Sequence, residues 1–198
     1  MPRRKLPPEI LEQECRDKAT VKAFLAALET ADIQTVANLI PHIEYVFEGW
    51  RRVMKAVARI NLDPPLWFRQ RLLSLWVGDG MRAEVNDDLL LLRGLPHLFP
   101  PYNGPALTLY RGEQFAKRRD RTYGLAWSRA LDVAWNHANG RMRCSAGGSV
   151  VLMTEAPADA IICDVAEHSD AYGEDEVLVD RRRLKKVHVL ERFTERKL

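Results

Sequence analysis

Residues 106–112 read Ala106-Leu-Thr-Leu-Tyr-Arg-Gly112, a run that predicts a short β-strand ending at a glycine. The ten residues before it, 96–105, are crowded with proline, asparagine and glycine, which is typical of a linker or a long ordered loop. The hydrophobic period is helical before this segment and strand-like after it. We therefore expect a helical lobe over residues 1–95 and a second domain over residues 106–198.

Apolar residues of the first half recur at steps of three and four, as they do on one face of a helix. The sharpest stripe runs from His42 to Ile60. Asp63-Pro64-Pro65 is expected to end that helix and begin the next, and Gly94 to cap the last one. These patterns predict helices over residues 9–28, 42–60, 66–77 and 81–93.

The second half contains several β-rich runs separated by turn residues. One helix is expected among them. Ser128 is its candidate N-cap, and its inner face would carry Leu131, Ala134, Trp135 and Ala138. The chain is therefore expected to have an α+β fold with five or more strands. The other strands are predicted at residues 149–154, 160–165, 177–180 and 186–193.

Composition excludes several classes of protein. With 46% hydrophobic residues among 198, the chain has enough apolar surface to fold. Its longest strongly apolar run, residues 89–92, is too short to cross a bilayer, and the basic N-terminus is not followed by an apolar signal core. A net charge of +3 does not by itself indicate a nucleic-acid partner. We expect a cytoplasmic protein whose three widely spaced cysteines form neither a disulfide framework nor a metal site.

Three polar features of the second half interrupt otherwise apolar surroundings. Arg111 ends the first strand, Ser128 follows a short strand-like run, and Glu174 and Glu176 precede the apolar strand at 177–180. Each has a simple structural explanation when taken alone. The arginine can be a solvated residue at a strand end, the serine a helix cap, and the acidic residues a solvated turn that protects a sheet edge.

Taken in this order, the three features resemble the arginine–serine–glutamate class of ADP-ribosyltransferases, which includes bacterial toxins, phage proteins and arginine-specific vertebrate enzymes. The resemblance covers about residues 106–193 and rests on Leu107-Thr-Leu-Tyr-Arg-Gly112, Gly124-Leu-Ala-Trp-Ser128 and Tyr172-Gly-Glu-Asp-Glu-Val-Leu-Val179. It implies a split β-sandwich that binds NAD. The chain departs from the family at its second motif, because aligning Trp127 with the family tryptophan puts Ala126 where the first serine lies and Ser128 on the third position.

The resemblance also implies roles for individual residues. Arg111 would bind the phosphate-ribose part of NAD with its planar fork of donors, and Gly112 would let the backbone approach the nicotinamide. Ser128 would support the site. Glu176 would stabilise the oxocarbenium character that develops as nicotinamide leaves, and Glu174 would accept a proton from the acceptor. Tyr172 would help to position that acceptor.

The expected function is therefore that of a mono-ADP-ribosyltransferase that consumes NAD as a substrate and needs no metal. The Glu-x-Glu form suggests transfer to a protein arginine within that family. Three alternatives stay open: an NAD glycohydrolase that uses water as acceptor, a nucleic-acid ADP-ribosyltransferase, and a degenerate, non-catalytic binding module. The basic run at residues 181–186 could contact phosphate, although such runs are more often solvated edges.

Overall fold

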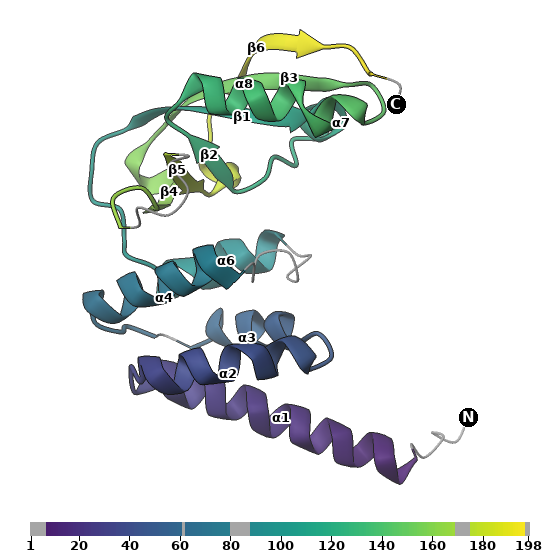
Figure 1. Cartoon of the computed structure of the whole chain (residues 1–198). Coiled ribbons are helices and arrows are strands. Elements are labelled where there is room, and N and C mark those ends of the chain that lie inside the picture. Colours follow the sequence, from purple (N-terminus) through teal and green to yellow (C-terminus); the bar gives the residue numbers. More distant parts are fainter. Residues whose placement is uncertain (1–6, 61, 80–87, 169–174, 197–198) are drawn as a thin grey trace. The chain divides into compact units, whose positions relative to one another are not determined.

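The structure, a computed structural model, describes residues 7–60, 62–79, 88–168 and 175–196. The chain divides into two compact units, Met1–Leu98 and Phe99–Leu198 (Figure 1). The division falls in the proline-rich neighbourhood from which the sequence predicted a boundary. Within the described residues, no helix has the length and apolar character needed to span a membrane.

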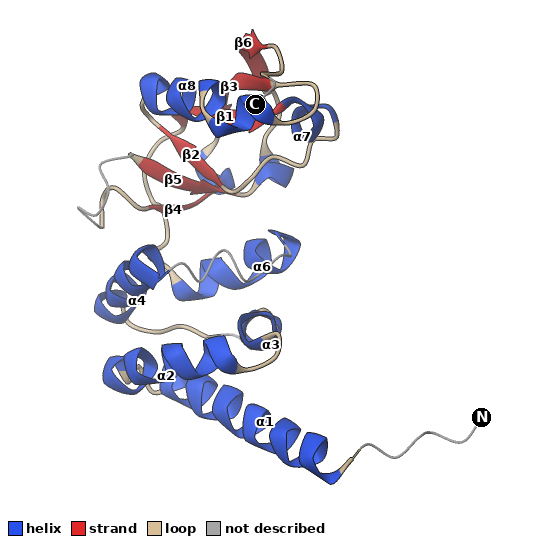
Figure 2. Cartoon of the chain, turned by 45° about the vertical axis from the view of Figure 1, so that its right-hand side comes forward, coloured by secondary structure: helices blue, strands red, loops and turns tan. Residues whose placement is uncertain are grey.

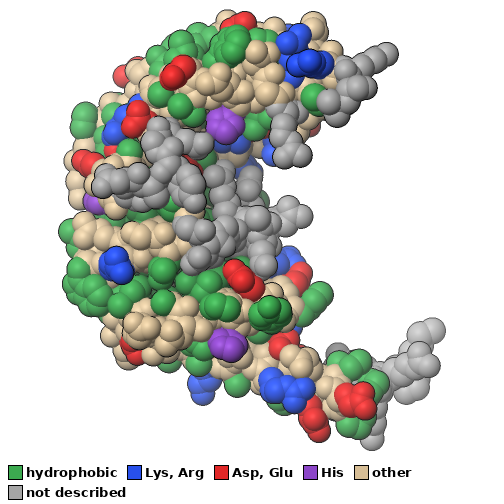
Figure 3. All heavy atoms as spheres, viewed as in Figure 1, with side chains coloured by type: hydrophobic (Ala, Val, Ile, Leu, Met, Phe, Trp, Pro, Cys, Tyr) green, Lys and Arg blue, Asp and Glu red, His purple; other side chains and the backbone are tan. Residues whose placement is uncertain are grey.

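The first unit is helical. Its core is built from fully buried aromatic and aliphatic side chains, among them Phe24 and Trp50, whose rings meet edge to face at 5.5 Å. Most charged side chains lie on the outer surface, although Asp17 and Arg69 are buried. Figure 3 shows acidic and basic groups close together over the first helix, where Lys18 pairs with Glu14 at 3.0 Å. The helices described are α1 (Pro8–Glu29), α2 (Ile33–Tyr45), α3 (Gly49–Val57), α4 (Leu66–Asp79) and α6 (Asp88–Leu98).

The single helix predicted over residues 42–60 is wrong, because the chain breaks between Tyr45 and Gly49. Glu48 adopts a left-handed conformation with φ of 52°. A Cβ at Gly49 would collide with the carbonyl oxygen of Ile43, so only glycine allows this close approach. The break is not visible in the sequence, because the apolar period continues through it. Phe47, which belongs to the predicted apolar stripe, is 74% exposed.

The predicted cap at Gly94 is also wrong, since Gly94 lies inside α6 and packs against α3. A Cβ there would lie 3.0 Å from the Met54 sulfur. Pro96, which the sequence assigned to the linker, lies inside the same helix. Most of the predicted helix over residues 81–93 precedes Asp88 and lies outside the described residues.

The second unit contains a six-stranded antiparallel sheet with the order β4-β5-β2-β1-β3-β6. The predicted α+β class is confirmed at this level, with a helical N-terminal region and an antiparallel sheet. Helices α7 (Phe115–Arg119) and α8 (Leu131–Asn139) follow β1 and β2. The strands are β1 (Leu107–Gln114), β2 (Ala126–Ser128), β3 (Ser149–Ala156), β4 (Ile161–Asp164), β5 (Glu176–Val179) and β6 (His188–Phe193).

This sheet is almost divided in two. β1 and β3 share eight paired positions, whereas β1 and β2 share only the pair Tyr110–Ser128. Figure 2 shows β4, β5 and β2 grouped on one side of this seam and β1, β3 and β6 on the other. Side chains of both groups contribute to one apolar core, for example Leu109 and Leu152 from one group and Trp127 and Val177 from the other.

Helix α8 covers the opposite face of the sheet, where Ala134 and Ala138 pack with Val151 and Phe193. The predicted inner face was only half right, because Leu131 and Trp135 are 45% and 39% exposed. Small alanines rather than large residues face the sheet, which lets the helix backbone come close to it.

Candidate active site

The three strands that carry the sequence motifs are neighbours, with β2 between β1 and β5. Ser128 ends β2 and is paired with Glu176, the first residue of β5, and with Tyr110 of β1. Residues directly opposite one another in antiparallel strands project to the same face. Tyr110, Ser128 and Glu176 therefore form a row across one face of the sheet, although Ser128 and Glu176 are 48 positions apart in the chain.

The register between β2 and β5 bears on Ala126, the position at which the second motif departs from the family pattern. Ala126 is paired with Leu178, an apolar residue, whereas Ser128 is paired with Glu176. A hydroxyl at position 128 is thus the one placed beside the glutamate. The geometry favours Ser128 over position 126 as the hydroxyl-bearing site residue.

Ser128 is buried, at 6% exposure, and its Oγ accepts a hydrogen bond from the backbone N–H of Ala130 at 2.9 Å. It therefore shapes the turn from β2 into α8. The prediction that Ser128 is the N-cap of that helix is wrong, since Ala130 holds the cap position and makes no side-chain cap bond. The strand extends further than expected because Ser128 still belongs to the β2–β5 ladder.

Glu176 is half-buried, and its backbone oxygen accepts a hydrogen bond from the N–H of Val165 at 3.0 Å. The side chain lies close to a buried thiol. Burial, together with the nearby carboxylates of Glu167 and Glu176, raises the pKa of Cys163 to about 12. This thiol is therefore neutral at physiological pH and does not act as a nucleophile. The negative charge of the row comes from Glu176.

Arg111 belongs to the other face of β1. Alternation places it with Leu109 and Glu113, and Leu109 lies in the apolar core between the two halves of the sheet. Its Nε donates to Glu113 at 2.8 Å, and its Nη1 donates to the backbone oxygen of Ala126. The structure brings Ser128 and Glu176 together but does not place Arg111 on their face.

Glu113 is a charged partner of Arg111 that the motif analysis did not consider. Its side chain is 1% exposed, and it accepts hydrogen bonds from Arg111 and from the N–H groups of Gly124 and Gln114. Burial alone would raise the pKa of Glu113, but the Arg111 charge and these hydrogen bonds outweigh it and hold the pKa below its ordinary value. A glutamate two residues after an arginine, in an otherwise apolar strand, was the available signal.

Gly112 has a packing role that its predicted role did not include. A Cβ at this position would lie 2.5 Å from the backbone oxygen of Ala134 and 2.6 Å from the backbone nitrogen of Ala138. Both atoms belong to α8. The glycine is therefore required for the close approach of helix and sheet, independently of any ligand.

A second ion pair holds the chain just before Glu176. The guanidinium of Arg129 pairs with Asp164, whose side chain is 1% exposed, and the N–H of Arg129 donates to the backbone oxygen of Asp175 at 3.2 Å. The other oxygen of Asp164, Oδ1, is buried without a hydrogen-bond partner in the described part of the chain. Arg129 thus ties the end of β2 to the start of β5, where Glu176 lies.

Two predicted site residues, Tyr172 and Glu174, lie outside the described residues. Among the residues that are described, no group of three histidine, cysteine, aspartate or glutamate side chains is arranged to hold a metal ion. The site as described is a hydroxyl and a carboxylate on adjacent strands, with Tyr110 beside them. Such an arrangement can bind a ribose hydroxyl and stabilise positive charge that develops next to it.

Comparison of the chain with protein-family models, with curated proteins and with solved structures found no match.

Proposed function

We propose that the second unit is a mono-ADP-ribosyltransferase domain whose nearly divided sheet is a split β-sandwich of that family. The observation that carries the proposal is the pairing of Ser128 with Glu176 across β2 and β5, with β1 as the next strand. The described parts of the motifs from which the family resemblance was inferred thus include residues of three adjacent strands. A fold in which the serine and the glutamate were distant would have removed the chemical basis of the proposal.

The proposed reaction breaks the bond between C1′ of the nicotinamide ribose and the nicotinamide nitrogen, and the electron pair leaves with nicotinamide. An acceptor nitrogen, which we assign to a protein arginine, forms the new bond to C1′ and loses a proton. Glu176 stabilises the oxocarbenium character of the ribose, because a carboxylate oriented beforehand needs no reorganisation when the charge develops. Glu174 is proposed to accept the proton, as the Glu-x-Glu motif suggests.

The assignment of Arg111 to the NAD phosphates stays a prediction, and its contacts support a second role. Its guanidinium already donates to Glu113 and to the backbone of Ala126. A phosphate would need Arg111 to exchange or share one of these partners. The contact with Ala126 lies two residues before Ser128, so Arg111 also acts as a positioning residue for β2.

Nicotinamide release from NAD tests the activity, and Glu176→Gln tests the site. This substitution keeps the size of the side chain and removes its charge, so we expect a loss of about a hundredfold or more in rate. Ser128→Ala should lower the rate as well. Glu155→Gln is the matched control, because Glu155 is an exposed carboxylate on β3 of the same unit.

The acceptor is identified by labelling a cell lysate with NAD that carries its label in the ADP-ribose part. Label that protease removes and nuclease does not supports transfer to protein, and free labelled ADP-ribose as the only product would indicate a glycohydrolase. No nicotinamide release from folded protein, in the presence of lysate, would contradict the proposal and leave a binding module.

A further inference from the structure

Two basic segments of the second unit lie side by side. Arg118 Nη2 donates to the backbone oxygen of Val187 at 3.4 Å, and Arg181 Nη1 donates to the backbone oxygen of Tyr123 at 2.8 Å. These contacts join the start of one segment to the end of the other, so the segments run antiparallel. We call their cations the basic strip: Lys117, Arg118, Arg119, Arg121, Arg181, Arg182, Arg183, Lys185 and Lys186.

The basic strip carries more net positive charge than the whole chain does. Its nine cations face three neighbouring carboxylates, those of Asp120, Asp159 and Asp180, which leaves six positive charges. The whole chain carries a net charge of +3, so everything outside this region is net negative. Positive charge is therefore concentrated in these two neighbouring segments, a pattern that the overall charge conceals.

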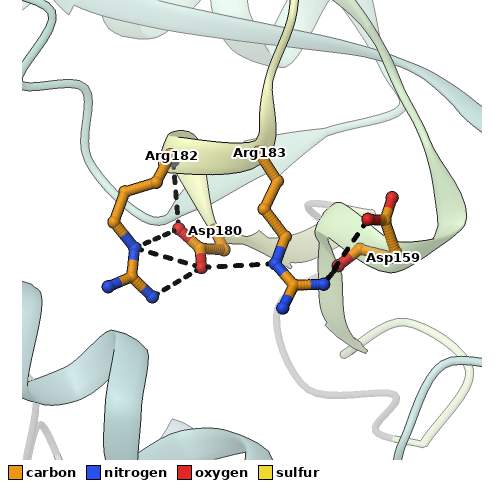
Figure 4. A network of polar contacts seen from close by, with 4 residues as sticks. All are labelled: Asp159, Asp180, Arg182 and Arg183. Carbon is orange, nitrogen blue, oxygen red and sulfur yellow. Dashed lines mark hydrogen bonds and ion pairs between the residues drawn. The ribbon is translucent and has the colours of Figure 1, made fainter.

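Two of the carboxylates, those of Asp159 and Asp180, orient Arg182 and Arg183 (Figure 4). Asp180 accepts hydrogen bonds from the N–H of Arg182, at 3.0 Å, and from its guanidinium, at 2.7 to 3.2 Å. Arg183 donates to the backbone oxygen of Asp159 at 2.8 Å. The arginines at 182 and 183 are thus held in one arrangement.

Four cations of the strip are exposed and make no ion pair or side-chain hydrogen bond among the described residues: Lys117, Arg121, Lys185 and Lys186. Such cations keep their full charge for a ligand. A surface that combines fixed guanidinium groups with available cations suits an anion with several regularly spaced charges.

The dimensions and composition of the strip indicate which polyanion. Arg181–Arg183 form a short 3-10 helix, so the segment from Arg181 to Val187 spans at most about 17 Å. Phosphates along one strand of duplex DNA are spaced about 3.4 Å along the axis, so about five phosphates match this length. Residues 117–121 and 181–186 include none of the exposed large hydrophobic side chains. Stacking on single-stranded bases and insertion into a membrane both depend on such side chains. We propose that the basic strip binds the phosphate backbone of double-helical nucleic acid without reading its sequence.

The test is fluorescence anisotropy with a labelled 20-base-pair duplex DNA of random sequence, in the absence of NAD. Four phosphate contacts give a slope of about −3.6 in log affinity against log salt, so raising salt from 50 to 200 mM should weaken binding on the order of a hundredfold. The double variant Lys185→Ala, Lys186→Ala should make that slope shallower by about 1.8. The control Lys22→Ala, Lys55→Ala removes two exposed cations of the helical unit and should change nothing.

Three results would overturn the proposal: no salt-dependent binding of the duplex, an equal loss of binding in the control variant, or tighter binding to single-stranded DNA or to vesicles containing phosphatidylserine. The proposal does not depend on the proposed activity. Glu176→Gln protein should bind the duplex as the wild type does, so failure of one proposal is distinguishable from failure of the other.

Discussion

The buried pair of Arg111 and Glu113 makes a sharp prediction about stability. Glu113→Ala removes the carboxylate to which Arg111, Gly124 and Gln114 donate, and leaves the Arg111 charge buried at 11% side-chain exposure. Removing one partner of a buried ion pair costs about 3–5 kcal/mol. Because small domains are stable by only about 5–15 kcal/mol, the second unit should lose a large part of its stability.

Urea unfolding followed by hydrogen–deuterium exchange in peptides from β1 and β3 measures this loss in the second unit alone. Glu155→Ala, which removes an exposed carboxylate from β3, should leave the midpoint unchanged. A loss below about 1 kcal/mol in Glu113→Ala would refute the reasoning, because it would mean that Arg111 does not depend on Glu113. The guanidinium would then be available to a phosphate without competition.

The same pair predicts a dependence on pH. The pKa of Glu113 is lower in the folded protein than its ordinary value of 4.5, so the unfolded chain binds its proton first as pH falls. The stability gained from ionised Glu113 is fully present above that ordinary value and is lost as pH falls through the lowered folded value. The difference in stability between wild type and Glu113→Ala should therefore be constant above about pH 5.5 and shrink below it. A difference that stayed constant down to pH 3 would contradict this cause.

Two further predictions follow from packing and burial. Gly112→Ala should destabilise the second unit by about 1–3 kcal/mol in the same urea assay, because the added Cβ meets backbone atoms of α8 that cannot move independently. Gly94→Ala should be nearly neutral, since the one close neighbour of its Cβ is the sulfur of the flexible Met54 side chain at 3.0 Å, the Met54 oxygen and Val57 lie at ordinary contact distance, and alanine favours the helix. Equal losses in the two variants would be inconsistent with this account. Iodoacetamide at pH 8 should modify exposed Cys15 in the native protein and Cys163 only after unfolding, because burial raises the pKa of Cys163 to about 12. Mass spectrometry of the alkylated peptides measures both rates, and equal native rates would show that Cys163 is accessible.

Sequence patterns predicted five of the six described strands of the second unit, because most of them are apolar runs between turn residues, whereas the three-residue β2 is too short to be predicted from its pattern. They also predicted that residues near Ser128 and Glu176 belong together, through the order of the motifs. They did not predict the face on which Arg111 lies. That face depends on a one-residue choice of register, and a shift of one residue reverses every side chain of a strand.

The errors in the helical unit have a different physical origin. The apolar period of residues 42–60 runs through a left-handed residue, and the sequence carries no strong punctuation there apart from Gly49. The helix Ile33–Tyr45 contains Pro41, which argues against a helix on local grounds. At the break before Gly49 tertiary packing decides the outcome, because the backbone of Gly49 lies directly against that of Ile43.

The seam in the sheet, where β1 and β2 share only the pair Tyr110–Ser128, determines which changes in chain length the site tolerates. β2 shares three paired positions with β5 and one with β1, so the partner of Ser128 is set by the β5 side. Insertions or deletions in the connection between Gln114 and Ala126 change the path to β2 without changing which residue faces Glu176. A one-residue slip between β2 and β5 would instead move Trp127 opposite Glu176, turning the serine to the other face of the sheet. Related chains that keep the serine–glutamate pair are therefore free to vary in the length of the β1–β2 connection, whereas the short β2–β5 ladder has to keep its register.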